Sequence, residues 1–232
     1  MAISRREAVT GALTASIAVA AGRAQAQGNG AQDNKDKKLE PTGQETLGPF
    51  YPVRAPVSHD LDLTHYPGRQ GRALGQVIQI TGRVLDVSGR PLPKAEFKIW
   101  QANAAGRYTN PVDDNPAPLD PNFLGVASFG VGEDGAYRLR TIKPGAYPEP
   151  TGTIRTPHIH FDVINADYRL VSQMYFPGEK LNRNDILLST LSARHRDPNS
   201  AICKPAATSE PGVMAFTWDI VLLTMARPLK HE

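Results

Sequence analysis

The chain has 232 residues, with 26 Lys and Arg against 23 Asp and Glu and a formal net charge of +3. No basic run with interleaved aromatic residues occurs, so nucleic acid is not an expected partner. The single cysteine, Cys203, cannot form an internal disulfide, and no neighbouring base marks it as a nucleophile. The 20 glycines and 20 prolines separate short apolar runs, which is typical of an all-β domain.

Residues 1–26 have the pattern of an export signal. Arg5 and Arg6 open a basic region, an uncharged run follows over residues 8–22, and Ala24-Gln25-Ala26 is an A-x-A cleavage pattern. The paired arginines favour the twin-arginine route, and an ordinary secretory signal is the alternative. The uncharged run is too short to span a bilayer. We therefore expect a periplasmic or otherwise exported protein that has no membrane contact after cleavage.

A flexible, charged linker over residues 27–41 and a single domain over residues 42–232 are expected next. Short apolar or alternating segments predict strands over 77–86, 95–101, 125–131, 136–142, 157–164, 169–176 and 215–223. A short helix is expected around residues 185–191. The predicted fold is an all-β, mainly antiparallel β-sandwich with long functional loops and few short helices.

Two histidines, His158 and His160, lie one residue apart in a predicted strand. Residues i and i+2 of a strand share a face, so both imidazoles project the same way while Ile159 and Phe161 pack behind them. Two imidazoles on a stiff strand are a common start of a metal site. Two polar residues on the wet face of a strand fit the same pattern, so the pair alone leaves metal binding open.

Two tyrosines lie in unusual settings. Tyr108 precedes a long loop rich in Pro and Asp, and Tyr147 lies in the rigid segment 143–148, which holds two prolines and a glycine. Each alone also fits an aromatic residue that caps the core with its hydroxyl in water.

Four segments in fixed order carry a family resemblance: residues 99–108, 119–123, 140–148 and 155–161. With them the chain resembles the intradiol ring-cleavage dioxygenases, most of all the iron-binding subunit in the branch that cleaves protocatechuate. The similarity runs from about Thr46 to Leu223, which is nearly all of the chain after the predicted signal and linker.

The resemblance implies one non-haem Fe³⁺ per chain, with Tyr108 and Tyr147 as equatorial and axial tyrosinates and His158 and His160 as equatorial and axial imidazoles. It implies that O₂ opens a catechol-type ring between its two hydroxylated carbons to give a cis,cis-muconate-type product. Anionic phenolates suit ferric iron, whereas the two-histidine, one-carboxylate set suits ferrous oxygenases.

Further roles follow from the same resemblance. Tyr147 would accept a substrate proton, Arg155 would place a permanent cation beside developing negative charge, and Gln173 would orient substrate and ligands. Judged without the resemblance, Arg155 fits a surface ion pair and Gln173 fits ordinary strand polarity.

The substrate pocket is expected to involve Thr46, Gly48, Pro49, Tyr108, Glu149 and Leu187. Residues 46–50 resemble a segment with which the family's metal-free subunit lines the pocket, so one chain, or a homo-oligomer of it, would serve both roles. Glu149 stands where the protocatechuate branch has tryptophan. Because a carboxylate repels an acidic substrate, we expect a catechol other than protocatechuate.

Two other classes of function were weighed. A non-catalytic β-sandwich module that binds aromatics or carbohydrate, like the metal-free subunit, is disfavoured by the presence of all four ligand positions. A zinc hydrolase built on His158 and His160 would need a further carboxylate or thiol ligand and a general base nearby.

Overall fold

The computed structural model describes residues 38–57, 61–149, 151–166, 168–194 and 200–223. The predicted export signal and residues 27–37 of the predicted linker lie outside these ranges. Within them, no helix has both the length and the apolar character needed to cross a membrane.

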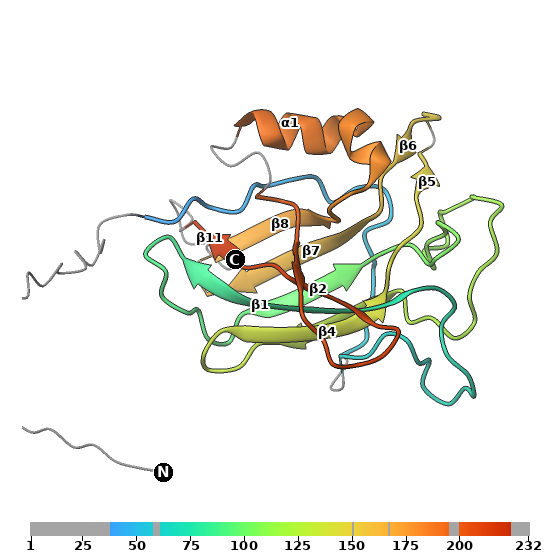
Figure 1. Cartoon of the computed structure of the whole chain (residues 1–232), viewed down its shortest axis with the longest axis horizontal. Coiled ribbons are helices and arrows are strands. Elements are labelled where there is room, and N and C mark those ends of the chain that lie inside the picture. Colours follow the sequence, from blue (N-terminus) through green and yellow to red (C-terminus); the bar gives the residue numbers. More distant parts are fainter. Residues whose placement is uncertain (1–37, 58–60, 150, 167, 195–199, 224–232) are drawn as a thin grey trace, which may run out of the picture. The chain divides into compact units, whose positions relative to one another are not determined.

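Two large sheets and a small two-stranded one form the described domain (Figure 1). In the first sheet, β1 (Val77–Asp86) pairs antiparallel with β4 (Ala136–Ile142) and parallel with β10 (Met214–Thr217) and β11 (Ile220–Leu222), and β9 (Lys204–Ala206) borders β10. The second sheet is antiparallel, in the order β3 (Val126–Gly130), β2 (Glu96–Trp100), β7 (His158–Asn165) and β8 (Tyr168–Tyr175). A two-stranded ribbon, β5 (Tyr147–Pro148) with β6 (Ile154–Arg155), precedes β7, and η1 (Lys180–Asn184) and α1 (Ile186–Arg194) follow β8.

The core lies between the two sheets. Alternate residues of the strands point inward, and Ile80 of β1, Phe97 of β2 and Phe161 of β7 belong to one fully buried cluster. This packing confirms the predicted all-β sandwich. Cys203 lies in the same cluster, where burial raises the pKa of its thiol to about 12, so it is not a poised nucleophile.

Most predicted strands are present, but the segment 215–223 forms two strands instead of one. The chain breaks between β10 and β11 at Trp218 and Asp219, where the Asp219 carboxylate accepts a hydrogen bond from Arg83 N. A Cβ on Gly82 would lie 2.0 Å from Trp218 O, so glycine permits this close crossing. Both strands run parallel to β1 within a mainly antiparallel fold. The short β5, β6, β9 and η1 were not predicted.

The outer face of the second sheet carries the candidate site. The register pairs Trp100 of β2 with His160 of β7, and His160 with Gln173 of β8, so these three side chains form a row across the sheet. The segment 38–57 begins against the first sheet, where Thr42 N donates to Val221 O at 2.9 Å. It then crosses the second sheet, to which it is tied where Glu45 N donates to Val171 O at 2.8 Å. The helix α1 lies beside β8 (Figure 1). Its Leu188 and Leu191 belong to the same buried cluster as Tyr175 of β8.

Candidate metal centre

The two histidines of β7 face each other at the centre of the site. Both are 2% exposed, and their Nε2 atoms lie 3.1 Å apart. His158 Nδ1 donates to Thr156 O at 2.7 Å, which places the lone pair of this imidazole on Nε2. The two Nε2 atoms therefore meet with at most one proton between them, as two imidazoles that share a cation would.

Two buried tyrosine rings complete the cluster. Tyr108 and Tyr147 are each 3% exposed, with ring centroids 5.2 Å apart. The Tyr147 ring lies 5.6 Å from that of His158, and the Tyr108 ring 6.2 Å from that of His160. The buried Tyr108 hydroxyl forms no hydrogen bond of standard geometry, although the Tyr147 hydroxyl lies near enough to help raise its pKa. A buried phenol without a well-formed hydrogen bond costs roughly 1–3 kcal/mol unless something else binds it. The structure thus brings all four predicted ligands together, and an unpartnered phenol among them fits a metal ion.

Burial governs the protonation of these groups. It lowers the pKa of His158 to about 3 and, with the neighbouring His158 and Arg155, lowers that of His160. It raises the pKa of Tyr147 to about 12 and that of Tyr108 well above the ordinary 10. The imidazoles are therefore already neutral, as ligands must be, whereas a metal must displace the phenol protons. Within the described ranges, His, Cys, Asp and Glu alone form no group of three that could hold a metal, so the phenols are essential to this donor set.

Glycine brings the two tyrosine loops into contact. Gly106 has φ of 82°, and a Cβ at this position would lie 2.2 Å from Ala146 O. The Tyr108 amide donates to Asp113 Oδ2 at 2.7 Å, which fixes the start of its loop. The spacing of Tyr108 and Tyr147 therefore depends on a backbone contact that any side chain at residue 106 would obstruct.

Arg155 is buried beside the four candidate ligands and is not part of a surface ion pair. Its Nε donates to Asp185 at 2.8 Å, Nη1 to Glu149 at 3.1 Å, and Nη2 to Gln173 at 2.8 Å. Burial by itself lowers the pKa of this guanidinium, but the hydrogen bond and charge of Asp185 outweigh it and the pKa is raised. Arg155 is therefore a permanent cation, and Gln173 is fully buried behind it.

Three members of this network were missed by the sequence analysis: Asp185, Tyr175 and Glu45. Tyr175 Oη donates to the Glu45 carboxylate at 3.0 Å and lies 3.3 Å from Arg155 Nη2. Asp185 also caps α1, because its Oδ1 accepts from Leu188 N at 3.0 Å. An Asp at the start of the helix predicted over 185–191 is a visible capping signal, whereas nothing local in the sequence marks Glu45 or Tyr175.

A cavity of about 610 Å³ opens onto the cluster and suits a small aromatic ligand. Tyr147, His160 and Arg155 line it, together with the predicted pocket residues Thr46, Gly48, Pro49, Glu149 and Leu187. Tyr108 is not among its lining residues and instead borders a separate cavity of about 420 Å³ with Trp100 and Phe50.

Residues 46–50, named here the covering segment, close over the cluster. Gly48 has φ of 72°, and a Cβ there would lie 3.3 Å from His160 Cε1. The Phe50 ring packs on Tyr108 at 4.6 Å, and the Trp100 ring stacks on His160 at 4.7 Å and 11°. The covering segment and the histidine pair belong to one chain, so this wall of the cavity forms without a second subunit.

Comparison with known proteins gives the family. Residues 46–224 match the dioxygenase family. The chain is 41% identical over 193 residues to the protocatechuate 3,4-dioxygenase beta chain of Burkholderia cepacia, covering 81% of this chain and 78% of that one. It is 28% identical over 176 residues to the catechol 1,2-dioxygenase of Candida albicans, where the match covers 66% of this chain but 52% of that enzyme.

Solved structures agree. The dioxygenase domain of a dioxygenase–carbohydrate-binding fusion from Streptomyces sp. SirexAA-E superimposes with a TM-score of 0.60 at 26% identity, covering 80% of this chain and all of that one. An intradiol ring-cleavage dioxygenase of Tetranychus urticae, at 17% identity, shares the fold with a TM-score of 0.63, covering 84% of this chain and 98% of that one. Fold and site define a β-sandwich oxidoreductase that cleaves aromatic rings, rather than a non-catalytic binding module. The chain belongs to the intradiol ring-cleavage dioxygenases, a family of non-haem iron enzymes.

Proposed function

We propose that Tyr108, Tyr147, His158 and His160 hold one Fe³⁺ per chain. The enzyme then uses O₂ to open a catechol-type ring between its hydroxylated carbons and yields a cis,cis-muconate-type product. The observation that carries this proposal is the meeting of two neutral imidazoles, with Nε2 atoms 3.1 Å apart, and two buried phenols, one of them unpartnered.

When bound, ferric iron supplies a Lewis acid that favours phenolate ligands and draws electron density from a catecholate, which readies the ring for O₂. Tyr147 lines the cavity and, as a phenolate, accepts a proton from a substrate hydroxyl. Arg155 borders the same cavity as a fixed cation and stabilises negative charge that develops on the aromatic ring. Gln173 holds Arg155 Nη2 at 2.8 Å and so keeps that cation in place.

Metal analysis, visible absorption and oxygen uptake test this function together. The purified protein with stoichiometric iron should be wine-red from tyrosinate-to-iron charge transfer and should consume O₂ with catechol. Tyr147→Phe should lose much of the band and lower kcat by roughly 10²–10⁴-fold, because a ligand and a proton acceptor are removed together. Tyr168→Phe, at the far end of β8, is the control. A colourless, iron-replete protein, or an unaffected Tyr147→Phe variant, would refute the proposal.

We further propose that the substrate is a catechol without a ring carboxylate. Glu149 lines the cavity, and one of its oxygens binds Arg155, so part of its charge is offset. The other oxygen remains available to accept a hydrogen bond from a hydroxyl substituent and to repel a carboxylate. Oxygen uptake with catechol, hydroxyquinol, pyrogallol, caffeate and protocatechuate ranks the substrates, and fastest turnover of protocatechuate would contradict this assignment.

Export over residues 1–26 is also part of the proposal, supported by Arg5-Arg6 and the Ala24-Gln25-Ala26 pattern. Periplasmic recovery of the wild type, and its loss when both arginines become lysine, would be expected for the twin-arginine route. Cytoplasmic retention of the uncleaved wild-type chain would rule export out.

A further inference from the structure

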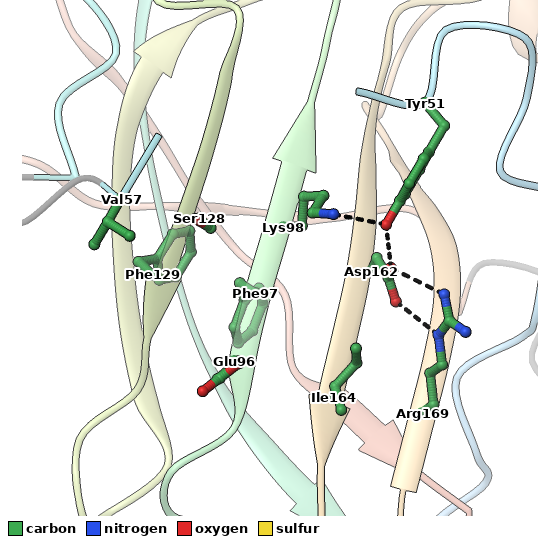
Figure 2. Close-up of a pocket in the computed structure, with 10 residues that line it drawn as sticks. All are labelled: Tyr51, Val57, Glu96, Phe97, Lys98, Ser128, Phe129, Asp162, Ile164 and Arg169. Carbon is green, nitrogen blue, oxygen red and sulfur yellow. Dashed lines mark hydrogen bonds and ion pairs between the residues drawn. The ribbon is translucent and has the colours of Figure 1, made fainter. Parts of the chain in front are cut away.

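A second polar cluster lies on the outer face of the same sheet, beside a cavity of about 500 Å³ (Figure 2). Tyr51 Oη donates to Asp162 Oδ2 at 3.0 Å and accepts from Lys98 Nζ at 2.8 Å. Arg169 Nε and Nη2 donate to the two Asp162 oxygens at 3.1 and 3.2 Å. Asp162 is thus satisfied by partners within the cluster, which favours a structural tie between segments over a site for a ligand.

The cluster and the metal centre share two strands. Lys98 of β2 pairs with Asp162 of β7, two residues along the strands from the pair of Trp100 with His160 and on the same face of the sheet. The Tyr51 ring packs edge-on against Trp100, with centroids 5.0 Å apart at 86°, and Trp100 in turn stacks on His160. The hydrogen-bond partners of Tyr51, Lys98 on β2 and Asp162 on β7, therefore lie on the same two strands as Trp100 and the histidine pair.

Tyr51 also directly follows the covering segment. Its neighbour Phe50 packs on Tyr108 and lies 5.9 Å from the Tyr147 ring, and Gly48 lies over His160. Within the described part of the chain, every hydrogen bond between residues 46–54 and the rest of the protein ends on Tyr51: those of its hydroxyl, and one from Asn110 Nδ2 to its carbonyl oxygen at 3.3 Å. The covering segment is thus held at one end by Glu45, through Val171 O and Tyr175, and at the other end by the hydroxyl of Tyr51.

We propose that Tyr51 is a positioning residue: its hydroxyl, held between Lys98 and Asp162, keeps the covering segment against the metal centre and at the wall of the substrate cavity. Its kinetic consequence rests on the proposed function, whereas its structural consequence does not. Loss of the hydroxyl should loosen the wall and weaken substrate binding, while the four metal-binding side chains remain.

Hydrogen–deuterium exchange of the iron-free protein tests the anchor without any activity. In Tyr51→Phe, exchange in a peptide over residues 42–54 should accelerate by roughly two- to tenfold, which corresponds to the loss of one or two hydrogen bonds, while β7 stays protected. This peptide contains the hydrogen-bonded amides of Thr42 and Glu45 beside the covering segment. Lys98→Met should act in the same direction and serves if Tyr51→Phe folds poorly. Tyr66→Phe, a 40% exposed tyrosine outside the cluster, is the matched control.

Steady-state kinetics of the iron-loaded enzyme test the consequence. Tyr51→Phe should raise KM for catechol by roughly two- to tenfold and leave kcat within about twofold of the wild-type value. Because Tyr51 and Lys98 act through the same hydrogen bond, KM of the double variant Tyr51→Phe with Lys98→Met should be only slightly higher than that of the stronger single variant. Unchanged exchange in both Tyr51→Phe and Lys98→Met would overturn the anchor. Faster exchange with unchanged KM would overturn the positioning role. Absence of dioxygenase activity in the wild type would instead refute the proposed function and leave the exchange result standing.

Discussion

At the scale of single residues, we expect Glu149 to influence which catechol the cavity accepts. Its side chain lies between Arg155, which it binds at 3.1 Å, and the cavity that it lines. From the presence of this carboxylate, the sequence analysis predicted that acidic substrates are repelled. The structure adds a guanidinium partner that reduces the repulsion, so the discrimination should be moderate.

Replacement of Glu149 by glutamine isolates this charge, because the amide oxygen can still accept the hydrogen bond from Arg155. We expect kcat/KM for protocatechuate to rise by roughly fivefold, which corresponds to about 1 kcal/mol between two charges in a partly solvated site. Turnover of uncharged catechol should change by less than about twofold, because catechol has no carboxylate that Glu149 could repel in the wild type. A parallel change for both substrates in oxygen-uptake assays would mean that Glu149 acts on Arg155 rather than on substrate charge.

At the scale of elements, the crossing of the Tyr108 and Tyr147 loops decides whether four donors meet. Gly106→Ala places a Cβ 2.2 Å from Ala146 O at a positive φ. We expect a loss of roughly 2–4 kcal/mol in unfolding free energy from strain and overpacking, accompanied by weaker iron retention.

Gly68→Ala is the control for Gly106→Ala, because Gly68 has φ of 76° but a Cβ there meets nothing within 4 Å. Gly68→Ala therefore has the free-energy cost of a positive φ but no steric clash of the new Cβ. Thermal unfolding and iron content should therefore separate the two variants, and equal losses in both would show that the close contact at Gly106 is unimportant.

At the scale of the whole molecule, one buried carboxyl couples stability to pH. Burial raises the pKa of Glu45 from 4.5 to about 7, and the hydrogen bond from Tyr175 and the charge of Arg155 offset this only in part. Because the folded state prefers the protonated acid, its stabilising contribution is complete below pH 4.5 and is lost as the pH rises through about 7.

Glu45→Gln imitates the protonated acid and keeps an acceptor for Tyr175. Its Tm should match that of the wild type near pH 4.5 and exceed it by roughly 2–6 °C at pH 8, allowing for partial solvent screening. Thermal scans of both proteins across this pH range give the difference in Tm at each pH. This difference removes the contribution of all other titrating groups, because the two proteins share them. A Tm difference that does not vary with pH would show that Glu45 keeps an ordinary pKa in the fold.

The sequence by itself determined what depends on neighbours along the chain. The alternation in β7 placed His158 and His160 on one face, and turn residues separated the strands. These inferences succeeded because strand periodicity and turn composition are local properties. The grouping of Tyr108 and Tyr147 with the histidines came instead from the family resemblance, because no local pattern predicts it.

Only the tertiary structure decided what depends on burial and on contacts between distant segments. It buried Arg155 among Asp185, Glu149 and Gln173, left Tyr108 out of the lining of the cavity beside Glu149, and brought Glu45 and Tyr51 to the outer face of the second sheet. It also split the last predicted strand into two strands parallel to β1. The physical reason is that desolvation, charge pairing and strand partners are set by residues far apart in the chain, such as Glu45 and Tyr175, which are 130 positions apart, and no local pattern encodes such contacts.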